Sequence, residues 1–313
     1  LYCLEDYKKQ LDYRLLNMET SIESVKIKRI LENQVSKITS LLNDYKKHQE
    51  KWIISHRNDR STTYEPITIN RFLDDALKTD DRIVFLISAT PHVYPGWEYR
   101  EVKSPFPKEI RPIKNIQIGS LSLKNRKNTI PKLAEFLAWG TFEGLIPGKT
   151  IVHVPSYAVA EELGKEIISC SRGLRIPIVQ SRASSVDSGG IEGATLRSEV
   201  IDVFKKSKDK WQILIAVNMG RGIDLPELDI KNNVITYLKR QNHTDKLVKA
   251  KLHKLGGTWM WQECANELMQ QYGRINRNND KVTNTVVTEP EFKQFMRLHG
   301  EYLREWFKEA IVE

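Results

Sequence analysis

The feature that most constrains the fold is a series of apolar runs separated by amphipathic stretches, from about residue 149 to the end of the chain. The clearest runs are TIVHVP (residues 150–155), QILIAV (212–217) and NNVITYL (232–238). Strands that are buried on both faces of a parallel sheet have this near-continuous apolar composition. The sequence therefore predicts an α/β fold with a parallel sheet sandwiched by helices.

Further elements complete this predicted domain, which we place at residues 131–313. We expect strands at residues 176–181 and 283–288, and helices at residues 158–169 and 195–206. A long helix is expected to end near Gln270, and another helix is expected at the C-terminus. Each expected helix has the apolar periodicity of an element that covers one face of a sheet.

The first 65 residues have a different composition, because they contain no Gly and no Pro. Apolar residues recur there at spacings of four and three, which is the pattern of a helical seam. The residues that show it are Leu31, Val35, Ile38, Leu42 and Tyr45. We predict a long-helix region at residues 1–64 that precedes the sheet domain and acts as a packing element.

Two segments lie between these regions. Residues 65–94 contain the apolar run IVFLIS followed by SATPH, which indicates a strand that ends in a turn. Residues 95–130 are rich in Pro, Lys and Asn, so we predict an irregular connector between two domains.

Composition narrows the environment and the partners. A formal net charge of +9 favours a polyanion, since clustered Lys and Arg gain affinity by releasing counterions from phosphates. Cys3, Cys170 and Cys264 lie far apart, so we expect no metal site and a reducing intracellular location, cytoplasmic or nuclear. Apolar runs fall far short of the roughly 20 residues of a membrane span, and we expect no membrane partner.

The strongest motif is QQYGRINR at residues 270–277. Arg274 and Arg277 are three residues apart, so both guanidinium groups can reach one polyphosphate if they project from one helical turn. An isolated pattern of this kind is more often a solvated basic turn, and its meaning depends on the motifs around it.

A second motif, AVNMGRGIDLPE at residues 216–227, directly follows the strand QILIAV. The carboxyl ends of parallel strands are where α/β folds place ligand sites. Asp224 can point into such a crevice because Gly222 offers little steric hindrance. Taken alone, this pattern is an ordinary turn between a strand and a helix.

Four motifs in this order and spacing resemble motifs III to VI of superfamily 2 helicases. They are SAT (residues 88–90), IVHVPSY (151–157), GRGID (220–224) and Q-x-x-G-R-x-x-R (270–277). The SPFP segment, the PSY turn and the W-x-W stretch at residues 259–261 resemble the XPD/DinG group of DNA helicases, whereas Arg221 within GRGID departs from that group's usual pattern. The resemblance implies a RecA-like second motor domain at residues 131–313 and the closing segment of a first motor domain at residues 65–94. Residues 1–64 would be an arch-like region or the end of that first motor domain.

The resemblance also implies a role for each matching residue. Arg274 and Arg277 would reach the γ-phosphate of ATP held by the other motor domain, with Gln270 on the same nucleotide face. Asp224 and Gly222 would link the nucleotide cleft to the nucleic acid, and Ser88 and Thr90 would couple hydrolysis to domain movement. The residues that would contact single-stranded DNA are Ser156, Tyr157 and Asn218.

The sequence contains no G-x-x-x-x-G-K-[ST] loop and no DEAD or DEAH acid pair. GLIPGKT at residues 144–150 is one residue short between its glycines and precedes a strand, so we reject it as a phosphate loop. The first residue is Leu, and we expect the chain to be part of a longer protein. ATP and Mg²⁺ would then be held mainly by a first motor domain upstream, and any iron–sulfur cluster of the XPD type would also lie outside this chain.

Three hypotheses about function follow. The first is the C-terminal half of an ATP-dependent DNA helicase or translocase, a hydrolase that would be inactive as this chain alone. The second is a helicase-like module that binds nucleic acid or a protein partner without catalysis. An RNA helicase is the third, and only the subgroup features argue against it.

Overall fold

We describe the protein from a computed structural model, which covers residues 2–17, 22–57, 62–67, 98–101, 103–140, 145–171, 178–180, 197–209, 211–217, 230–275 and 281–312. The chain divides into two compact units. The smaller unit comprises residues 1–85 and 242–256, and the larger unit comprises residues 86–241 and 257–313. Each unit is described separately.

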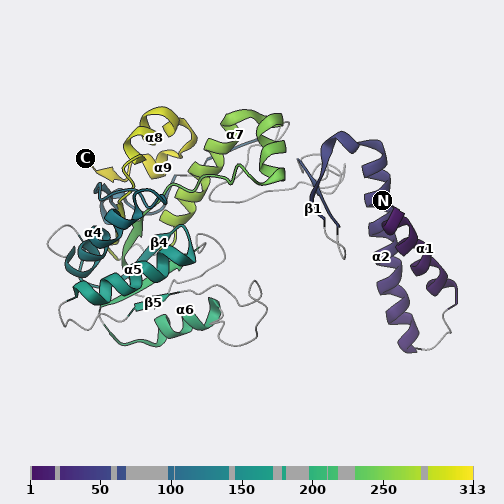
Figure 1. Ribbon diagram of the computed structural model, residues 1–313, viewed down its shortest axis with the longest axis horizontal. Coiled ribbons are helices and arrows are strands. Elements are labelled where there is room, and N and C mark those ends of the chain that lie inside the picture. The colour runs from purple at the N-terminus through teal and green to yellow at the C-terminus, as the bar shows by residue number, and fades with distance from the viewer. Residues whose placement is uncertain are drawn as a thin grey trace. The chain divides into compact units, whose positions relative to one another are not determined.

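The smaller unit begins with two packed helices, α1 (Tyr2–Leu16) and α2 (Ile22–Lys47), followed by the short 3-10 helix η1 (Gln49–Lys51). Leu42 of α2, a member of the predicted apolar seam, is buried, and so is Leu11 of α1. Lys46 and Glu5 form an ion pair of 2.5 Å between the two helices. Long helices, as expected for this region, are therefore present in the described residues up to Lys47 (Figure 1).

The expectation of helix throughout residues 1–64 is wrong at its C-terminal end. Strands β1 (Trp52–Arg57) and β2 (Thr62–Pro66) form an antiparallel pair there. Their sequences, WIISHR and TTYEP, are rich in the β-branched and aromatic residues that favour extended backbone. Absence of Gly and Pro is compatible with a strand as well as with a helix, so it was not sufficient to predict helix.

The larger unit is built on a seven-stranded sheet in which every described pairing is parallel. Its strand order is β5-β6-β4-β7-β8-β3-β9. The strands are β3 (Ile113–Asn115), β4 (Lys149–Val154), β5 (Ile178–Gln180), β6 (Gln212–Val217), β7 (Ile230–Ile235), β8 (Asn284–Val287) and β9 (Ile311–Val312). The prediction of a RecA-like parallel sheet sandwiched by helices is confirmed.

Helices cover both faces of this sheet (Figure 1). Helices α4 (Arg126–Trp139) and α5 (Tyr157–Cys170) lie side by side and pack on the face that carries Val152 and Val154 of β4. On the other face lie α6 (Arg197–Lys206), residues 257–272 of α7 (Lys246–Tyr272), α8 (Phe292–His299) and α9 (Glu305–Lys308). Ile151 points to this second face, as the period of two in a strand requires.

The segment predicted to be an irregular connector, residues 95–130, contributes to the sheet instead. β3 lies between β8 and β9, and Ile113 at its start is completely buried. Ile113 N–H donates to the carbonyl of Ala310 at 2.7 Å, and Thr285 N–H donates to the carbonyl of Pro112 at 3.0 Å. Three residues cannot display a period, so only these distant partners define the strand.

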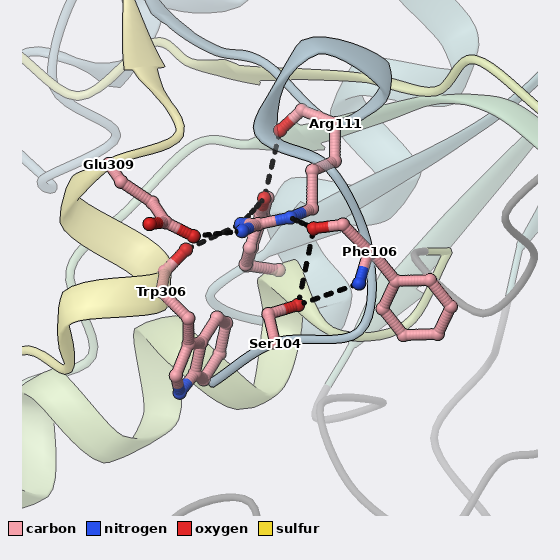
Figure 2. Close-up of polar contacts among 6 residues, drawn as sticks. Ser104, Phe106, Arg111, Trp306 and Glu309 are labelled. Atoms are coloured by element: carbon pink, nitrogen blue, oxygen red, sulfur yellow. Dashed lines mark hydrogen bonds and ion pairs between the residues drawn. The ribbon is translucent and has the colours of Figure 1, made fainter. Parts of the chain in front are cut away.

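A buried arginine joins the start of β3 to the C-terminal elements (Figure 2). Arg111 is 2% exposed and donates hydrogen bonds to the carbonyl of Phe106 at 2.9 Å and to the hydroxyl of Tyr272 at 3.0 Å. It also donates to the carbonyl of Trp306 and pairs with the carboxylate of Glu309 at 2.5 Å. Tyr272 returns a hydrogen bond to the Arg111 carbonyl at 2.8 Å. Every nitrogen of the guanidinium group thus has an acceptor.

Candidate functional site at the carboxyl edge of the sheet

The N-terminus of α5 follows β4 directly and carries two of the predicted nucleic-acid contacts. Ser156 is its N-cap, in extended conformation, and its hydroxyl accepts a hydrogen bond from Val159 N–H at 3.3 Å. This is the usual N-cap arrangement, in which a serine oxygen satisfies one of the unpaired donors of the first turn. Tyr157 is 39% exposed and is accessible to a ligand. Its contact with DNA stays a prediction.

The residues predicted to face the nucleotide lie where α7 ends. Gln270 is in the last turn of the helix, while Arg274 lies in the turn that follows Tyr272. The expectation that Arg274 projects from a turn of the helix is therefore wrong, because α7 ends at Tyr272 and Arg274 N–H donates to the carbonyl of Gln271, three residues back, at 3.3 Å. Arg274 is 8% exposed, and one of its terminal nitrogens lies 3.4 Å from Gln270 Oε1. The structure thus brings Gln270 and Arg274 together.

The turn that holds Arg274 lies against β4. Burial lowers the pKa of His153 in β4 to about 4, and the nearby positive charge of Arg274 acts in the same direction. His153 is therefore a neutral imidazole near pH 7, as expected for a histidine buried beside a cation. Sequence inspection did not single out His153, because a histidine within an apolar strand gives no local signal of the group it faces.

Two hydrogen bonds fix the end of α7 to β7 and to the segment that follows β7. Asn233 donates from Nδ2 to the carbonyl of Gln271 at 3.1 Å, and both residues are buried. Gln271 donates from Nε2 to the hydroxyl of Tyr237 at 3.3 Å. The Arg274 turn is consequently held relative to the carboxyl edge of the sheet.

Several predicted site residues lie outside the described residues, so no geometry is assigned to them. These residues are Arg277, Asp224, Gly222, Asn218, Ser88 and Thr90.

The order of the strands defines a switch point on this edge. The chain leaves β4 through α5 toward β5 on one side of the sheet, and it leaves β7 through α7 toward β8 on the other side. β4 and β7 are neighbours, so the connections from two adjacent strands diverge to opposite faces. In open α/β sheets such a divergence leaves a crevice outside the carboxyl ends of the strands, where ligands bind.

A cavity of about 400 Å³ lies at this switch point, and we call it the switch-point cavity. Pro155 after β4 contributes to its lining, as do residues that follow β3, β7 and β8. The polar residues that line it are Ser120, Ser122, Tyr237, Lys239, Arg240, Glu289 and Glu291. None of these was a predicted site residue. The strand-end rule applied to residues 216–227 also applies to the ends of NNVITYL and TNTVVT and would have pointed to Lys239, Arg240, Glu289 and Glu291, but not to the two serines.

The basic residues of the cavity are each paired with an acid. Lys239 lies 3.6 Å from the carboxylate of Glu267, and Arg240 forms an ion pair with Glu291. The guanidinium of Arg240 also lies over the ring of Trp261, at 5.7 Å from its centroid. Within the cavity, burial raises the pKa of Glu289 to about 7. A backbone hydrogen bond from Glu291 and the charge of Arg240 oppose this shift, and the charge of Glu291 acts in the same direction as burial. Burial likewise raises the pKa of Tyr237 to about 12.

Two general searches give limited results. In the part of the chain that the structure describes, no three metal-binding side chains come together in a possible ion site. Among the described residues there is also no helix with the length and apolar character needed to cross a membrane.

Comparison with known proteins identifies the family. Residues 141–310 match the model of the helicase C-terminal domain, which is more than half of the chain. The chain therefore belongs to the helicase C-terminal domain family, as its resemblance to helicase motifs predicted. Among curated proteins, no sequence matches the chain.

Solved structures with a similar course include S. tokodaii Xpd4, at 14% identity and a TM-score of 0.49, with 98% of this chain and 65% of that chain covered. Another is RecG bound to a three-way DNA junction, at 16% identity and a TM-score of 0.31, with 66% of this chain and 22% of that chain covered. The chain thus spans about two thirds of the length of the Xpd4 chain.

Proposed function

We propose that this chain is the C-terminal half of an ATP-dependent DNA helicase or translocase and binds the nucleic-acid strand. It would also supply arginines to a nucleotide held by a first motor domain. The observation that carries the proposal is the family match over residues 141–310, which includes the Q-x-x-G-R-x-x-R motif and the α5 N-terminus. The net charge of +9 and the accessible Tyr157 support a nucleic-acid partner.

The described part of the proposed nucleotide face fits phosphate oxygens but not a metal ion. Arg274 and the amide of Gln270 lie within hydrogen-bond reach of each other, and both can donate to oxygens of a polyphosphate. No described group of carboxylates is arranged to hold Mg²⁺. The residues that hold Mg²⁺ and cradle the phosphates are proposed to lie in the first motor domain. ATP would supply the free energy of movement when bound between the two.

Arg274 and Arg277 would have different tasks in this proposal. Arg274 is fixed beside His153 and Gln270, so it would set the electrostatic environment of the cleft. Arg277 would be the principal finger that stabilises charge on the transferred phosphoryl group, a contribution of about 10³ to 10⁵ in rate in hydrolases that use such fingers. Stabilisation that arises mainly in the transition state changes turnover more than nucleotide affinity.

The decisive experiment compares Arg277→Ala with wild type in the full-length protein, using steady-state ATP hydrolysis and nucleotide binding. We expect turnover to be lost while ATP affinity and thermal unfolding stay close to wild type. Near wild-type turnover would refute the finger assignment. The chain of 313 residues by itself should not hydrolyse ATP, and turnover by the purified chain would contradict the division of labour between two domains.

DNA binding is tested with the chain itself, by fluorescence anisotropy of a labelled single-stranded oligonucleotide over a salt series. Affinity should fall steeply with salt and depend weakly on base sequence, because the proposed contacts are to the backbone. A marked preference for RNA of matched sequence would favour an RNA helicase instead. Salt-independent binding would contradict the backbone contacts.

A further inference from the structure

We propose that the switch-point cavity binds a backbone phosphate of the nucleic acid, with Lys239 and Arg240 as its cations, and that protonation of Glu289 controls this binding. The inference rests on the proposed function, because it assumes that the domain holds a nucleic-acid strand. It assigns to that function a new set of residues and a regulatory group.

The position of the cavity is the first argument. Pro155 lines the cavity and is followed directly by Ser156, the N-cap of α5. The cavity therefore borders the residue that immediately precedes the predicted contacts Ser156 and Tyr157. It also lies where β4 and β7 send their connections to opposite faces, which is the general place for ligands in open α/β sheets.

The lining chemistry is the second argument. Ser120, Ser122 and Tyr237 offer hydroxyl groups, and Lys239 and Arg240 offer charged donors. Hydroxyl, ammonium and guanidinium groups are the side-chain donors that proteins use for phosphate oxygens in nucleic acids. A volume of about 400 Å³ is sufficient for a phosphodiester with its sugar.

Arg240 is available although it has an acidic partner, while Lys239 keeps Glu267 as its partner at 3.6 Å, a separation longer than a hydrogen bond. The side chains of Arg240 and Glu291 are 52% and 50% exposed, and pairs at such exposure are typically worth less than about 1 kcal/mol. A phosphate can therefore replace Glu291 at little cost. Stacking over Trp261 keeps the Arg240 guanidinium at the rim of the cavity while it changes partners.

Glu289 supplies the control. The residue is 6% exposed, and burial raises the pKa of its carboxyl group to about 7. The charged and titratable groups that line the cavity with it are Tyr237, Lys239, Arg240 and Glu291. Below pH 7 the carboxyl group is mainly neutral and can donate a hydrogen bond to a phosphate, whereas above pH 7 its negative charge repels one. Binding should therefore weaken as pH rises.

The experiment measures the affinity of the chain for a labelled oligothymidylate between pH 6 and pH 8 at constant ionic strength. If only the protonated form binds, the dissociation constant of wild type should rise about tenfold over this range. Glu289→Gln keeps the shape and stays neutral, so its affinity should remain near the pH 6 value of wild type throughout. If the dissociation constant changes equally with pH in wild type and in Glu289→Gln, the proposed role of Glu289 is overturned.

The two cations are tested with Lys239→Met and Arg240→Met. A plot of log affinity against log salt concentration falls with a negative slope. Each variant should reduce the magnitude of this slope by about 1, which corresponds to the loss of one phosphate contact. Lys132→Met removes the same charge from the exposed face of α4, outside the cavity, and should leave the slope unchanged. Equal changes in all three variants would show that only overall charge matters and would overturn the site.

A competition experiment distinguishes a phosphate of the nucleic-acid backbone from a phosphate of a nucleotide or free phosphate. Unlabelled oligonucleotide should displace the label, while ADP and inorganic phosphate at equal phosphate concentration should not. If Arg240→Met weakens ADP binding and leaves oligonucleotide binding intact, the cavity is a nucleotide site and the inference is wrong. If wild type fails to bind the oligonucleotide even at pH 6 and low salt, both this inference and the proposed DNA contact fail.

Discussion

Arg111 and Arg240 are both paired with a glutamate on the same sheet domain, but their surroundings differ. Arg111 is 2% exposed and donates to four acceptors on Phe106, Tyr272, Trp306 and Glu309 (Figure 2). Arg240 is about half exposed, pairs with Glu291 and borders the switch-point cavity. In the first case the protein itself satisfies the charge. In the second the charge can still exchange partners.

This difference separates structural from functional use of the same side chain. If the buried network is broken, either the arginine or its acceptors stay buried without a hydrogen-bond partner, which costs a large desolvation free energy. The Arg111 side chain is therefore held in one set of hydrogen bonds. An exposed pair adds little to stability and can open when a ligand offers a better acceptor. The four predictions below test this distinction, from the largest expected effect to the smallest.

Replacement of Arg111 by Met should have the largest effect. The change leaves the Trp306 carbonyl without its side-chain donor, removes one donor each from Tyr272 and Phe106, and removes the cation that pairs with Glu309. We expect a loss of about 3 to 5 kcal/mol in the free energy of unfolding. Urea denaturation followed by circular dichroism measures the loss. A loss below about 1 kcal/mol would mean that the network contributes no more than a surface pair.

Glu289→Gln should change stability in a pH-dependent way. The pKa of Glu289 is raised to about 7 in the folded chain, so the native state binds more protons than the unfolded state between about pH 4.5 and 7, and its stability falls as pH rises through this window. Gln does not titrate, so the variant should be more stable than wild type by about 2 to 3 kcal/mol at pH 8. The difference should vanish near pH 4.5. Thermal or urea unfolding at the two pH values provides the comparison, and a constant difference would contradict the raised pKa.

Tyr272→Phe removes one hydroxyl from the Arg111 network and keeps the ring. That ring stacks on Trp306 at 5.8 Å and meets the edge of Phe307 at 5.1 Å, so its packing should be retained. Loss of two buried hydrogen bonds, one of them to a charged group, should cost about 1 to 3 kcal/mol in unfolding free energy. Tyr237→Phe, at the cavity, serves as the matched control and should cost less, since its hydroxyl accepts a single longer hydrogen bond from a neutral group, Gln271 Nε2, at 3.3 Å.

Arg240→Met should be the mildest change in stability, below about 1 kcal/mol, because the ion pair is exposed and the aliphatic part of the side chain is kept. The same denaturation measurement used for Arg111→Met provides the test. A destabilisation equal to that of Arg111→Met would mean that Arg240 is a structural residue. A loss of DNA affinity in Arg240→Met would then be a consequence of unfolding and not of a lost phosphate contact.

Regular patterns in the sequence account for much of the sheet domain. Residues 212–217 were predicted as a strand and form β6 with the same bounds, because six buried residues in a row leave few alternatives to a central parallel strand. The helix predicted at residues 158–169 likewise forms α5, and Ser156, between a strand and this amphipathic helix, is its N-cap.

Local sequence failed where the interacting groups are far apart along the chain. β3 has three residues, and its position depends on backbone hydrogen bonds to residues more than 170 positions away, including Thr285 and Ala310. Arg111 looks like an ordinary charged residue in a Pro- and Lys-rich segment, yet it is among the most buried side chains of the described residues. Nothing nearby in sequence indicates the acceptors that surround it.

For the candidate site, too, some features follow from the sequence and others only from the tertiary structure. The sequence by itself determined the parallel α/β domain, its helicase family and the motif that contains Arg274, because each is recorded in a contiguous pattern of residue types. Only the tertiary structure decided that Arg274 is buried beside His153, and that Glu289, Arg240 and Ser120 share one cavity. The physical reason is that burial, electrostatic environment and cavities arise from residues brought together by the order of the strands, and a chain pattern does not contain that order.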